Sequence, residues 1–441
     1  MFRISQTQHL QYILNPSETK TAPEPLPNSL RRSSRVSSLI RQTFSALQYY
    51  NYRLWFGGQT VSLFGTWMQR SAQGYLIFDL TRSPIYLGYV GFAYGVPSWL
   101  FMIYGGAIAD RFPRRTILLI AQVAMMLLAF ILAALTFTEL VQPWQIIVLA
   151  FFLGCANAFD APARQAFVTD LVNRKDLTNA IALNSSMINT ATVFGPAVAG
   201  ITYAAFGPAW CFTINGFTFI AVIIALLLMK LAPFQPIDRA ISILSEVKEG
   251  LRFAARKPTI RILIINLGIL SLAGLGFVTL LPVWAVDVLG GDATTNGFLH
   301  TARGLGALSG ALLIAAVGQS YSKGKLFTIG TFVMPIFLIL FSFTRILPTS
   351  FLTLLGAGWG FMVVVNLSNT LVQTSVTDEL RGRVMGIFTF TFFGFMPIGS
   401  LINGALAEQI GAPLTVQINA LILLTAAFLL VLRFPIIRAQ N

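Results

Sequence analysis

The chain has 441 residues, of which 55% are hydrophobic and only 10% are charged, and its formal net charge is +14. Soluble proteins contain roughly 25% charged residues, so this composition excludes an ordinary soluble globular protein. The cations lie in short groups between apolar stretches and form no continuous stripe, so no nucleic-acid partner is expected. Only His9 and His300 are present, which excludes a multi-histidine metal site, and no metal or other cofactor is expected.

The first fifty residues differ from the rest of the chain. The stretch 16–38 is rich in Pro, Ser and Arg and has no apolar periodicity, so residues 1–50 are predicted to form a disordered cytoplasmic tail. Arginines between positions 31 and 35 leave an organellar transit peptide as an alternative, but Glu18 and Glu24 argue against it. No apolar signal-peptide core precedes the first long apolar stretch.

Apolar stretches of about 20 residues, the length that crosses a bilayer, recur along the rest of the chain. In chain order they cover residues 54–78, 85–109, 116–137, 144–168, 180–204 and 209–231, and then 260–286, 296–317, 326–344, 351–374, 384–407 and 414–434. The sequence therefore predicts an all-α integral membrane protein with twelve transmembrane helices in two six-helix bundles, residues 51–231 and 259–435. A short tail, residues 436–441, follows the second bundle.

Residues 232–258 separate the two bundles and are predicted to form a cytoplasmic linker. Within it, Ile243, Val247, Leu251 and Ala254 recur at helical spacing, which indicates an amphipathic surface helix.

Charge asymmetry predicts how the chain crosses the membrane. With the spans as above, only Arg82 and Arg345 lie at one face, and the other loop cations lie at the opposite face: Arg53, Arg111, Arg114, Arg115, Arg174, Lys175, Lys323, Lys325, Arg381, Arg383 and Arg433. Because the cation-rich loops of membrane proteins are cytoplasmic, both termini are predicted inside, in a multi-pass protein of the plasma (inner) membrane.

The two predicted bundles share a short internal repeat. Gln165-x-x-Val168-Thr169-Asp170 ends the fourth span, and Gln373-x-x-Val376-Thr377-Asp378 ends the tenth. Identical residues at equivalent places in two sets of six spans suggest a duplicated unit.

A charged turn between the second and third spans carries the most specific motif. It reads Gly106-x-x-x-Asp110-Arg111-x-x-Arg114-Arg115. Such a cluster is too costly to bury at membrane depth, so the turn must lie at a bilayer face. The motif resembles the loop between helices 2 and 3 of the major facilitator superfamily, which implies two pseudo-symmetric six-helix bundles. The corresponding turn of the second bundle, from Gly318 to Lys325, lacks the acid.

Two further stretches resemble one branch of that superfamily, the branch of enterobactin exporters and macrolide-efflux-like proteins. They are residues 160–165 and 380–385. Asp160 and Arg164 are four residues apart and share a helical face. We interpret Asp160 and Arg164, with the Asp110 turn, as a gating latch that closes the cytoplasmic side. A purely structural ion-pair cluster is the alternative.

The fifth span contains Gly195, Pro196 and Gly200. Proline inside a helix kinks it, and the glycines allow close helix packing. The stretch resembles an element of helix 5 that is associated with antiport in this superfamily. A kinked packing helix without any bearing on transport direction is the alternative.

Polar residues within the spans are the candidates for substrate contact. Arg70 is predicted to be a counter-ion for an anionic substrate, or alternatively to hold helices together through backbone carbonyls or Asp79. In the superfamily, helices 1, 4, 7 and 10 line the central cavity, so the candidate cavity residues are Gln69, Arg70, Gln73, Asn157, Asn266, Asn366, Asn369 and Gln373.

Coupling to protons is implied by the family resemblance, and the residues leave the carrier open. The candidates are His300 with its neighbour Arg303, Asp160 and Asp287. Histidine titrates near neutral pH, and a buried carboxyl can be shifted toward that range.

The sequence thus predicts a monomeric secondary active transporter that exports a small amphipathic molecule, drug-like or siderophore-like, in exchange for protons. A proton-independent facilitator or importer of a small metabolite is the alternative, and a non-transporting membrane receptor is a remote one. An enzyme is not expected, because His, Asp and Glu do not cluster at membrane depth. The expected partners are the small-molecule substrate, protons and the lipid bilayer.

Overall fold

The fold is that of a computed structural model, which describes residues 44–232, 243–317 and 322–433. Within these ranges the side chains of residues 102–107, 109–110, 243–247 and 378 are not described. The chain divides into two units, Met1–Ser45 and Ala46–Asn441, and the account below concerns the second. The predicted tails, residues 1–50 and 436–441, lie largely or wholly outside the described residues.

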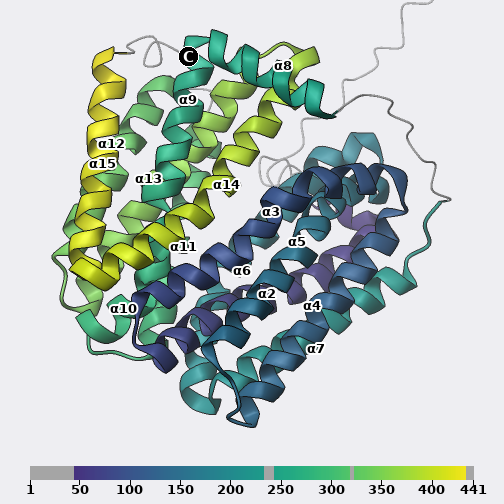
Figure 1. Cartoon of the computed structure of the whole chain (residues 1–441). Helices are drawn as coiled ribbons and strands as arrows, with labels where there is room; N and C mark the ends of the chain where they lie inside the picture. The colour runs from purple at the N-terminus through teal and green to yellow at the C-terminus, as the bar shows by residue number, and fades with distance from the viewer. Residues whose placement is uncertain (1–43, 233–242, 318–321, 434–441) are drawn as a thin grey trace, which may run out of the picture. The chain divides into compact units, whose positions relative to one another are not determined.

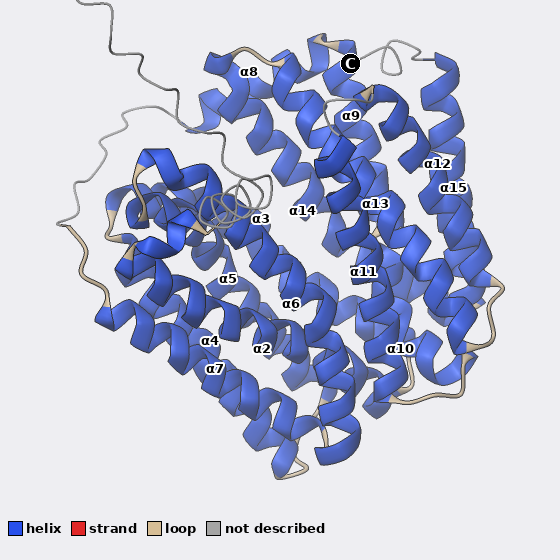
Figure 2. Ribbon diagram, turned by 180° about the vertical axis from the view of Figure 1, so that it is seen from behind, coloured by secondary structure: helices blue, strands red, loops and turns tan. Residues whose placement is uncertain are grey.

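Helices make up the described part of the second unit, and no strand occurs among its described residues (Figure 2). A short helix, η1 (Ser45–Gln48), precedes six long helices that we call the first half: α2 (Tyr50–Thr81), α3 (Pro84–Arg111), α4 (Arg114–Phe137), α5 (Pro143–Leu171), α6 (Leu177–Phe206) and α7 (Pro208–Leu228). Between α5 and α6 lies the short η2 (Arg174–Asp176).

The second half begins with a helical stretch, Pro258–Val288, that changes its winding several times. It runs through α9 (Pro258–Ile269), η3 (Leu270–Gly274), η4 (Gly276–Leu280), α10 (Leu281–Val283) and η5 (Trp284–Val288). The second half continues with α11 (Ala293–Val317), α12 (Lys323–Ser342), α13 (Leu347–Ser375), α14 (Asp378–Ile410) and α15 (Ala412–Arg433).

Proline and glycine mark several of the helix boundaries. Prolines stand in the first turn of α3, α5 and α7, where a missing backbone N–H costs nothing. Gly207 and Gly411 end α6 and α14 with φ of 88° and 82°, in the left-handed region that favours glycine.

All twelve predicted spans coincide with helical stretches whose ends differ by a few residues, as at 229–231 and 343–344, which lie past helix ends. Nine helices in the described ranges are both long and apolar enough to cross a membrane. The other three, α2, α3 and α6, have 32, 28 and 30 residues, which exceeds the spanning length. The number of membrane crossings therefore remains a prediction for these three helices.

The predicted linker helix is present as α8 (Ile243–Arg256), which packs against α9 and α14 (Figure 1). Its Gly250 lies against Arg383 and Ile387 of α14, and Glu249 forms a 2.6 Å ion pair with Arg383. We call this end of the bundles the linker end and the opposite end the remote end.

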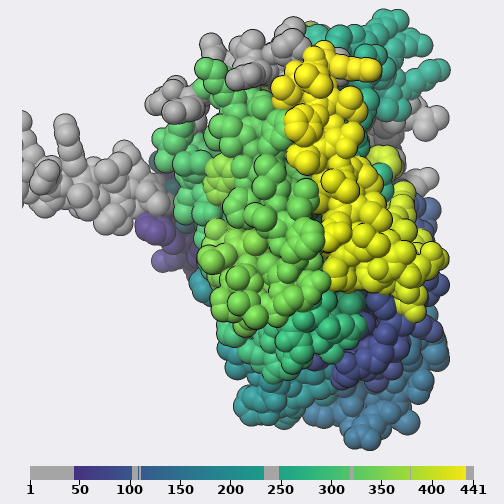
Figure 3. Space-filling model, turned by 90° about the vertical axis from the view of Figure 1, so that its left-hand side faces the viewer, coloured from purple at the N-terminus to yellow at the C-terminus, as the bar shows by residue number. Residues whose placement is uncertain are grey.

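Apolar side chains cover the outer faces of the helices. α12 and α15 lie side by side on the face seen in Figure 3. They expose Ile336, Leu340, Phe428 and Leu432 by 44–75%. An exposed apolar surface of this kind suits contact with lipid chains.

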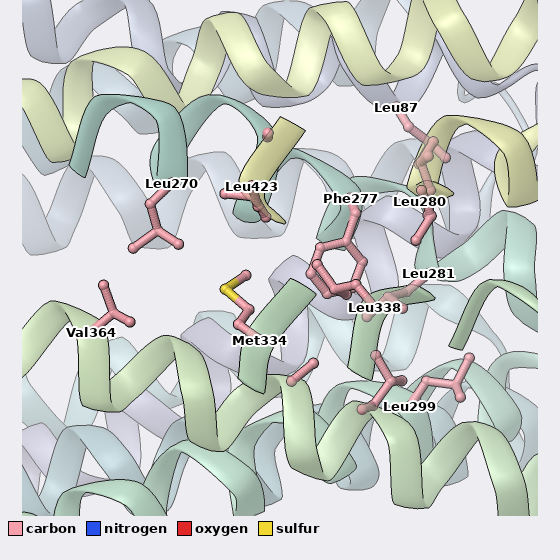
Figure 4. Packing of buried hydrophobic residues seen from close by; sticks show 14 of the residues in the cluster. Leu87, Leu270, Phe277, Leu280, Leu281, Leu299, Met334, Leu338, Val364 and Leu423 are labelled. Carbon is pink, nitrogen blue, oxygen red and sulfur yellow. The ribbon is translucent and has the colours of Figure 1, made fainter. Parts of the chain in front are cut away.

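The largest apolar core surrounds the stretch with irregular winding in the second half and extends into the first half, where it includes Phe78 and Phe212. Around the irregular stretch, Phe277, Leu338 and Met334 are at most 2% exposed and pack with Leu270 and Val364 (Figure 4).

The two halves contact each other through α3 with α14 and α6 with α11 (Figure 1). Six hydrogen bonds between described residues of the two halves lie between the remote end and the middle of the helices. They join Ser83 and Ile85 to Glu408, Trp99 to Gly394, Thr294 to Gly200, Asn296 to Ser71, and Thr301 to Val193.

Candidate functional site

Arg70 is held in the membrane-embedded part of α2 by aromatic side chains. Its Nη2 donates a hydrogen bond to the Tyr94 hydroxyl on α3. Its guanidinium carbon lies 4.7 Å from the centre of the Tyr94 ring and 5.1 Å from that of Trp67, within the range of a cation–π contact. The Nε atom is buried and has no hydrogen-bond partner among the described residues. The guanidinium is thus positioned without a neutralising carboxylate in the described part of the chain.

Arg70 lies on the face of α2 that meets the second half. Gly74, one helical turn further on, faces the ring of Pro282 in α10. Asp79, the alternative partner of Arg70, instead forms a 2.7 Å ion pair with Arg82. The alternative based on Asp79 is therefore not realised in this structure.

Two other candidates on α2, Gln69 and Gln73, are buried inside the first half. Gln69 accepts a 2.6 Å hydrogen bond from Asn215 of α7, and Gln73 donates to the carbonyl of Ile146 on α5 over 3.5 Å. Both side chains are at most 5% exposed. The structure therefore does not bring these two glutamines together with Arg70, and their contacts join helices.

The remaining amide candidates are spread over three helices. Gln373 on α13 is exposed and donates a 2.5 Å hydrogen bond to Asn369. Asn366 on α13 and Asn157 on α5 are partly exposed, and Asn266 on α9 is buried. A partly open polar stripe on α13 is thus present, with Asn369 and Gln373 already paired.

The charged turn at the linker end is anchored within the first half. Arg114, at the start of α4, forms a 2.7 Å ion pair with Asp170 and also donates to the carbonyl of Ala166 over 3.3 Å, both on α5. Arg115 donates to the carbonyl of Leu227 at the end of α7 over 2.9 Å. Gly106, Asp110 and Arg111 belong to the last turns of α3, but the side chains of Gly106 and Asp110 lie outside the described residues.

Asp160 forms a separate buried cluster. It is 2% exposed, accepts a 2.9 Å hydrogen bond from Gln122 of α4 and lies 3.3 Å from Nε of Arg164. The predicted proximity of Asp160 and Arg164 is thus found, whereas Arg114 pairs with Asp170 and not with Asp160.

The glycines of α6 allow two close helix approaches. Gly195 faces Trp67 on α2, where a methyl group would lie 2.7 Å from the Trp67 Cβ. Gly200 and Pro196 face α11, and a methyl group at Gly200 would lie 2.5 Å from the carbonyl oxygen of Ala293. Pro196, inside α6, thus lies where the first half meets the second half.

The candidate proton carriers do not gather in one place. His300 and Arg303 lie one turn apart on α11, Asp160 lies toward the linker end of α5, and Asp287 is exposed in η5 near the remote end. No arrangement of these groups singles out one carrier.

Sequence reasoning missed the partners that shape these sites. They are Tyr94 and Trp67 at Arg70, Asp170 at Arg114, Gln122 at Asp160 and Asn215 at Gln69. Of these partners, only Asp170 could have been singled out from the sequence, because it ends the repeated Gln-x-x-Val-Thr-Asp motif.

Comparison with known proteins places these features in a family. A family model described as a transmembrane secretion effector of the major facilitator superfamily matches residues 41–441. The staphyloferrin A transporter of Staphylococcus aureus is 26% identical over 83% of this chain and 92% of its own length. The enterobactin exporter EntS of Shigella flexneri is 28% identical over 71% of this chain and 73% of its own length.

The fold also matches solved structures. A bacterial homologue of the human lysosomal transporter Spinster, in an inward-facing and occupied conformation, superimposes with a TM-score of 0.71 at 14% identity. The match covers 88% of this chain and 98% of that protein, and at this level of identity it supports the fold alone.

Proposed function

Because the chain belongs to the transmembrane secretion effector family of the major facilitator superfamily, we propose that it exports a small amphipathic acid by proton-coupled secondary transport. It is in this proposal a transporter and not an enzyme. The relatives described as transporting staphyloferrin A and exporting enterobactin support a siderophore-like substrate.

The environment of Arg70 is the observation that carries the substrate class. A guanidinium fixed on two aromatic rings, with no carboxylate partner among the described residues, is a pre-positioned anion site at membrane depth. Such a site attracts an acidic group of the substrate and disfavours cationic drugs. The neighbouring rings of Trp67 and Tyr94 add apolar surface, which suits an amphipathic molecule.

The two six-helix bundles are residues 51–231 and 259–435. Rocking of one bundle against the other would open the substrate site at Arg70 to each side of the membrane in turn. Hydrogen bonds join the halves at Glu408, Gly200 and Asn296, toward the remote end, which supports a state that is closed there. With both termini and the linker cytoplasmic, as the distribution of loop cations predicts, the remote end is the extracytoplasmic one. In this proposal the protein acts as a monomer in the plasma membrane.

The linker-end ion pairs are assigned a gating role. Arg114–Asp170 and the hydrogen bond from Gln122 to Asp160 join α4 to α5, and Asp160–Arg164 is an ion pair within α5. In the outward-open state, this charged end and Asp110 would close against the second half. The substitution Asp110→Asn should then impair transport without reducing membrane insertion, and unchanged transport by a well-inserted variant would exclude the gating role.

The proposed substrate class is tested with inverted membrane vesicles that contain the protein. Uptake of an amphipathic carboxylic acid is compared with uptake of its neutral methyl ester, in the wild type and in Arg70→Gln. The proposal expects selective uptake of the acid by the wild type and its loss in the variant. Equal uptake of acid and ester by the wild type would exclude Arg70 as an anion site.

A further inference from the structure

The outer face of α8 combines basic and apolar side chains. The helix runs across the linker end of the second half, and its inner face buries two small residues, Gly250 and Ala254 (Figure 1). Residues three and four positions apart share a helical face. On the side away from the buried residues, one such face carries exposed Lys248, Leu251, Arg252, Ala255 and Arg256.

The acids described on α8 do not neutralise this face. Glu249 forms its ion pair with Arg383 of α14, and the side chain of Glu246 lies outside the described residues. Within the described part of the chain, the side chains of Lys248, Arg252 and Arg256 form no ion pair. The outer face of α8 therefore presents three unbalanced cations.

The end of α8 lies at the level of the bilayer surface. The helical stretch Pro258–Val288 is long and apolar enough to cross a membrane, and only Lys257 separates it from α8. At a rise of about 1.5 Å per residue, Arg256 lies within one helical turn of the start of that stretch. The outer face of α8 is thus within reach of lipid headgroups.

Two further cations are held at the same junction. The Lys257 ammonium donates a 3.0 Å hydrogen bond to the carbonyl of Ser375 and lies 5.2 Å from the centre of the Phe253 ring. Arg261, in the first turns of α9, donates over 3.4 Å to the carbonyl of Ala255 on α8. Cation clusters on an amphipathic helix or next to a spanning helix attract anionic lipid headgroups.

Leu251 favours a membrane surface over a soluble anion as the occupant of this face. It is 53% exposed and lies between Lys248 and Arg252. A small soluble anion gains nothing from an apolar side chain between two cations. A bilayer surface offers phosphate groups to the cations and the upper part of the acyl chains to the leucine.

We propose that the outer face of α8 binds anionic phospholipids of the leaflet at the linker end, with Leu251 at the boundary of the acyl chains. This surface is separate from Arg70 and from the contacts between the halves. The proposal therefore stands whether or not the chain transports an acid, and its test measures no transport.

The experiment uses mass spectrometry under native conditions on the purified full chain in detergent. The protein is mixed with equal amounts of phosphatidylglycerol and phosphatidylcholine that carry the same acyl chains. We expect the wild type to retain phosphatidylglycerol preferentially. In the triple variant Lys248→Gln, Arg252→Gln and Arg256→Gln the preference should fall about tenfold or more, since each cation near an anionic surface favours binding by roughly fivefold.

A second triple variant is the matched control. Lys323→Gln, Lys325→Gln and Arg433→Gln remove the same charge from the linker ends of α12 and α15. This variant should keep the preference of the wild type. An equal loss in both triple variants would overturn the assignment to α8, because it would show an effect of net charge alone.

Three further outcomes would overturn the proposal. The first is equal retention of the two lipids by the wild type. The second is displacement of phosphatidylglycerol by the same concentration of soluble glycerol phosphate, which would identify a site for soluble anions. The third concerns Leu251→Gln, which keeps every cation and should retain less phosphatidylglycerol than the wild type. Unchanged retention in that variant would contradict contact between α8 and the lipid.

Discussion

The carboxylate of Glu408, near the end of α14, accepts a 2.7 Å hydrogen bond from the hydroxyl of Ser83, just before α3. The same oxygen accepts a 3.3 Å bond from the backbone amide of Ile85, in the first turn of α3. A carboxylate at a helix N-terminus is favoured by the helix dipole and by the unpaired amides there. One side chain of the second half thus caps a helix of the first half at the remote end.

Loss of this cap should open the remote end more often. In Glu408→Ala the two donors lose their acceptor, whereas Glu408→Gln keeps an oxygen and is the matched control. Leu140 and Ile346 are exposed and lie in remote-end loops of the two halves. Spin labels at these positions report the distance between the halves in pulsed electron paramagnetic resonance. We expect a larger population of long distances in Glu408→Ala only. Identical distance distributions in both variants would show that the cap does not hold the halves.

The remote end should also open more often when the close packing of α6 on α11 is disturbed. A methyl group at Gly297 would lie 2.5 Å from the carbonyl oxygen of Pro196, which is too close for either backbone to remain in place. We expect Gly297→Ala to shift the same spin-label pair to longer distances and to slow transport.

The control for this variant is Gly386→Ala, because a methyl group at Gly386 has no neighbouring atom within 4 Å. It should leave both the distances and the transport rate unchanged. If Gly297→Ala behaves like Gly386→Ala, the contact between α6 and α11 does not limit the conformational change.

Arg70 should discriminate between acidic and neutral substrates. A charge-assisted hydrogen bond contributes about 1.5–3 kcal/mol, so Arg70→Gln should weaken binding of an acid by roughly tenfold to a hundredfold. Binding of the matched neutral ester should change little. Tyr94→Phe removes only the hydroxyl partner and should weaken acid binding less, as measured by substrate-induced quenching of tryptophan fluorescence. An equal loss for acid and ester would indicate a structural role for Arg70.

The two ion pairs at the linker end should differ in their effect on stability. Asp160 is 2% exposed, and removal of one partner from a buried pair costs about 3–5 kcal/mol. The Asp170 side chain is 40% exposed, and pairs of that kind contribute at most about 1 kcal/mol. Asp160→Leu should therefore lower the thermal unfolding midpoint clearly and Asp170→Asn only slightly. A reversed order would show that the Asp160 carboxylate is not held by Gln122 and Arg164.

Features with a strong local pattern were predictable from the sequence. Long apolar stretches predicted the helices that the structure shows. The motif of glycine, aspartate and arginines from Gly106 to Arg115 indicated the superfamily, which the family match confirms. The amphipathic pattern in the linker located α8, although Leu251 is 53% exposed and does not belong to the packed face.

Features that depend on how helices cross were not predictable. Gln69 and Gln73 lie close to Arg70 in the sequence. On the helix, however, their side chains face α7 and α5. The pairing of Arg70 with Tyr94 requires the crossing of α2 and α3, which periodicity does not give. The irregular winding near Gly274 was also missed, although Gly268, Gly274, Gly276 and Pro282 stand close together there.

Proton-coupled export of an acid is tested most directly in proteoliposomes that contain the purified protein, an imposed pH gradient and a fluorescent amphipathic carboxylic acid. The account predicts that the acid moves against its own concentration gradient, that a protonophore abolishes this movement, and that Arg70→Gln does not support it. Movement only down the concentration gradient, at a rate independent of the pH difference, would contradict the account and identify a facilitator.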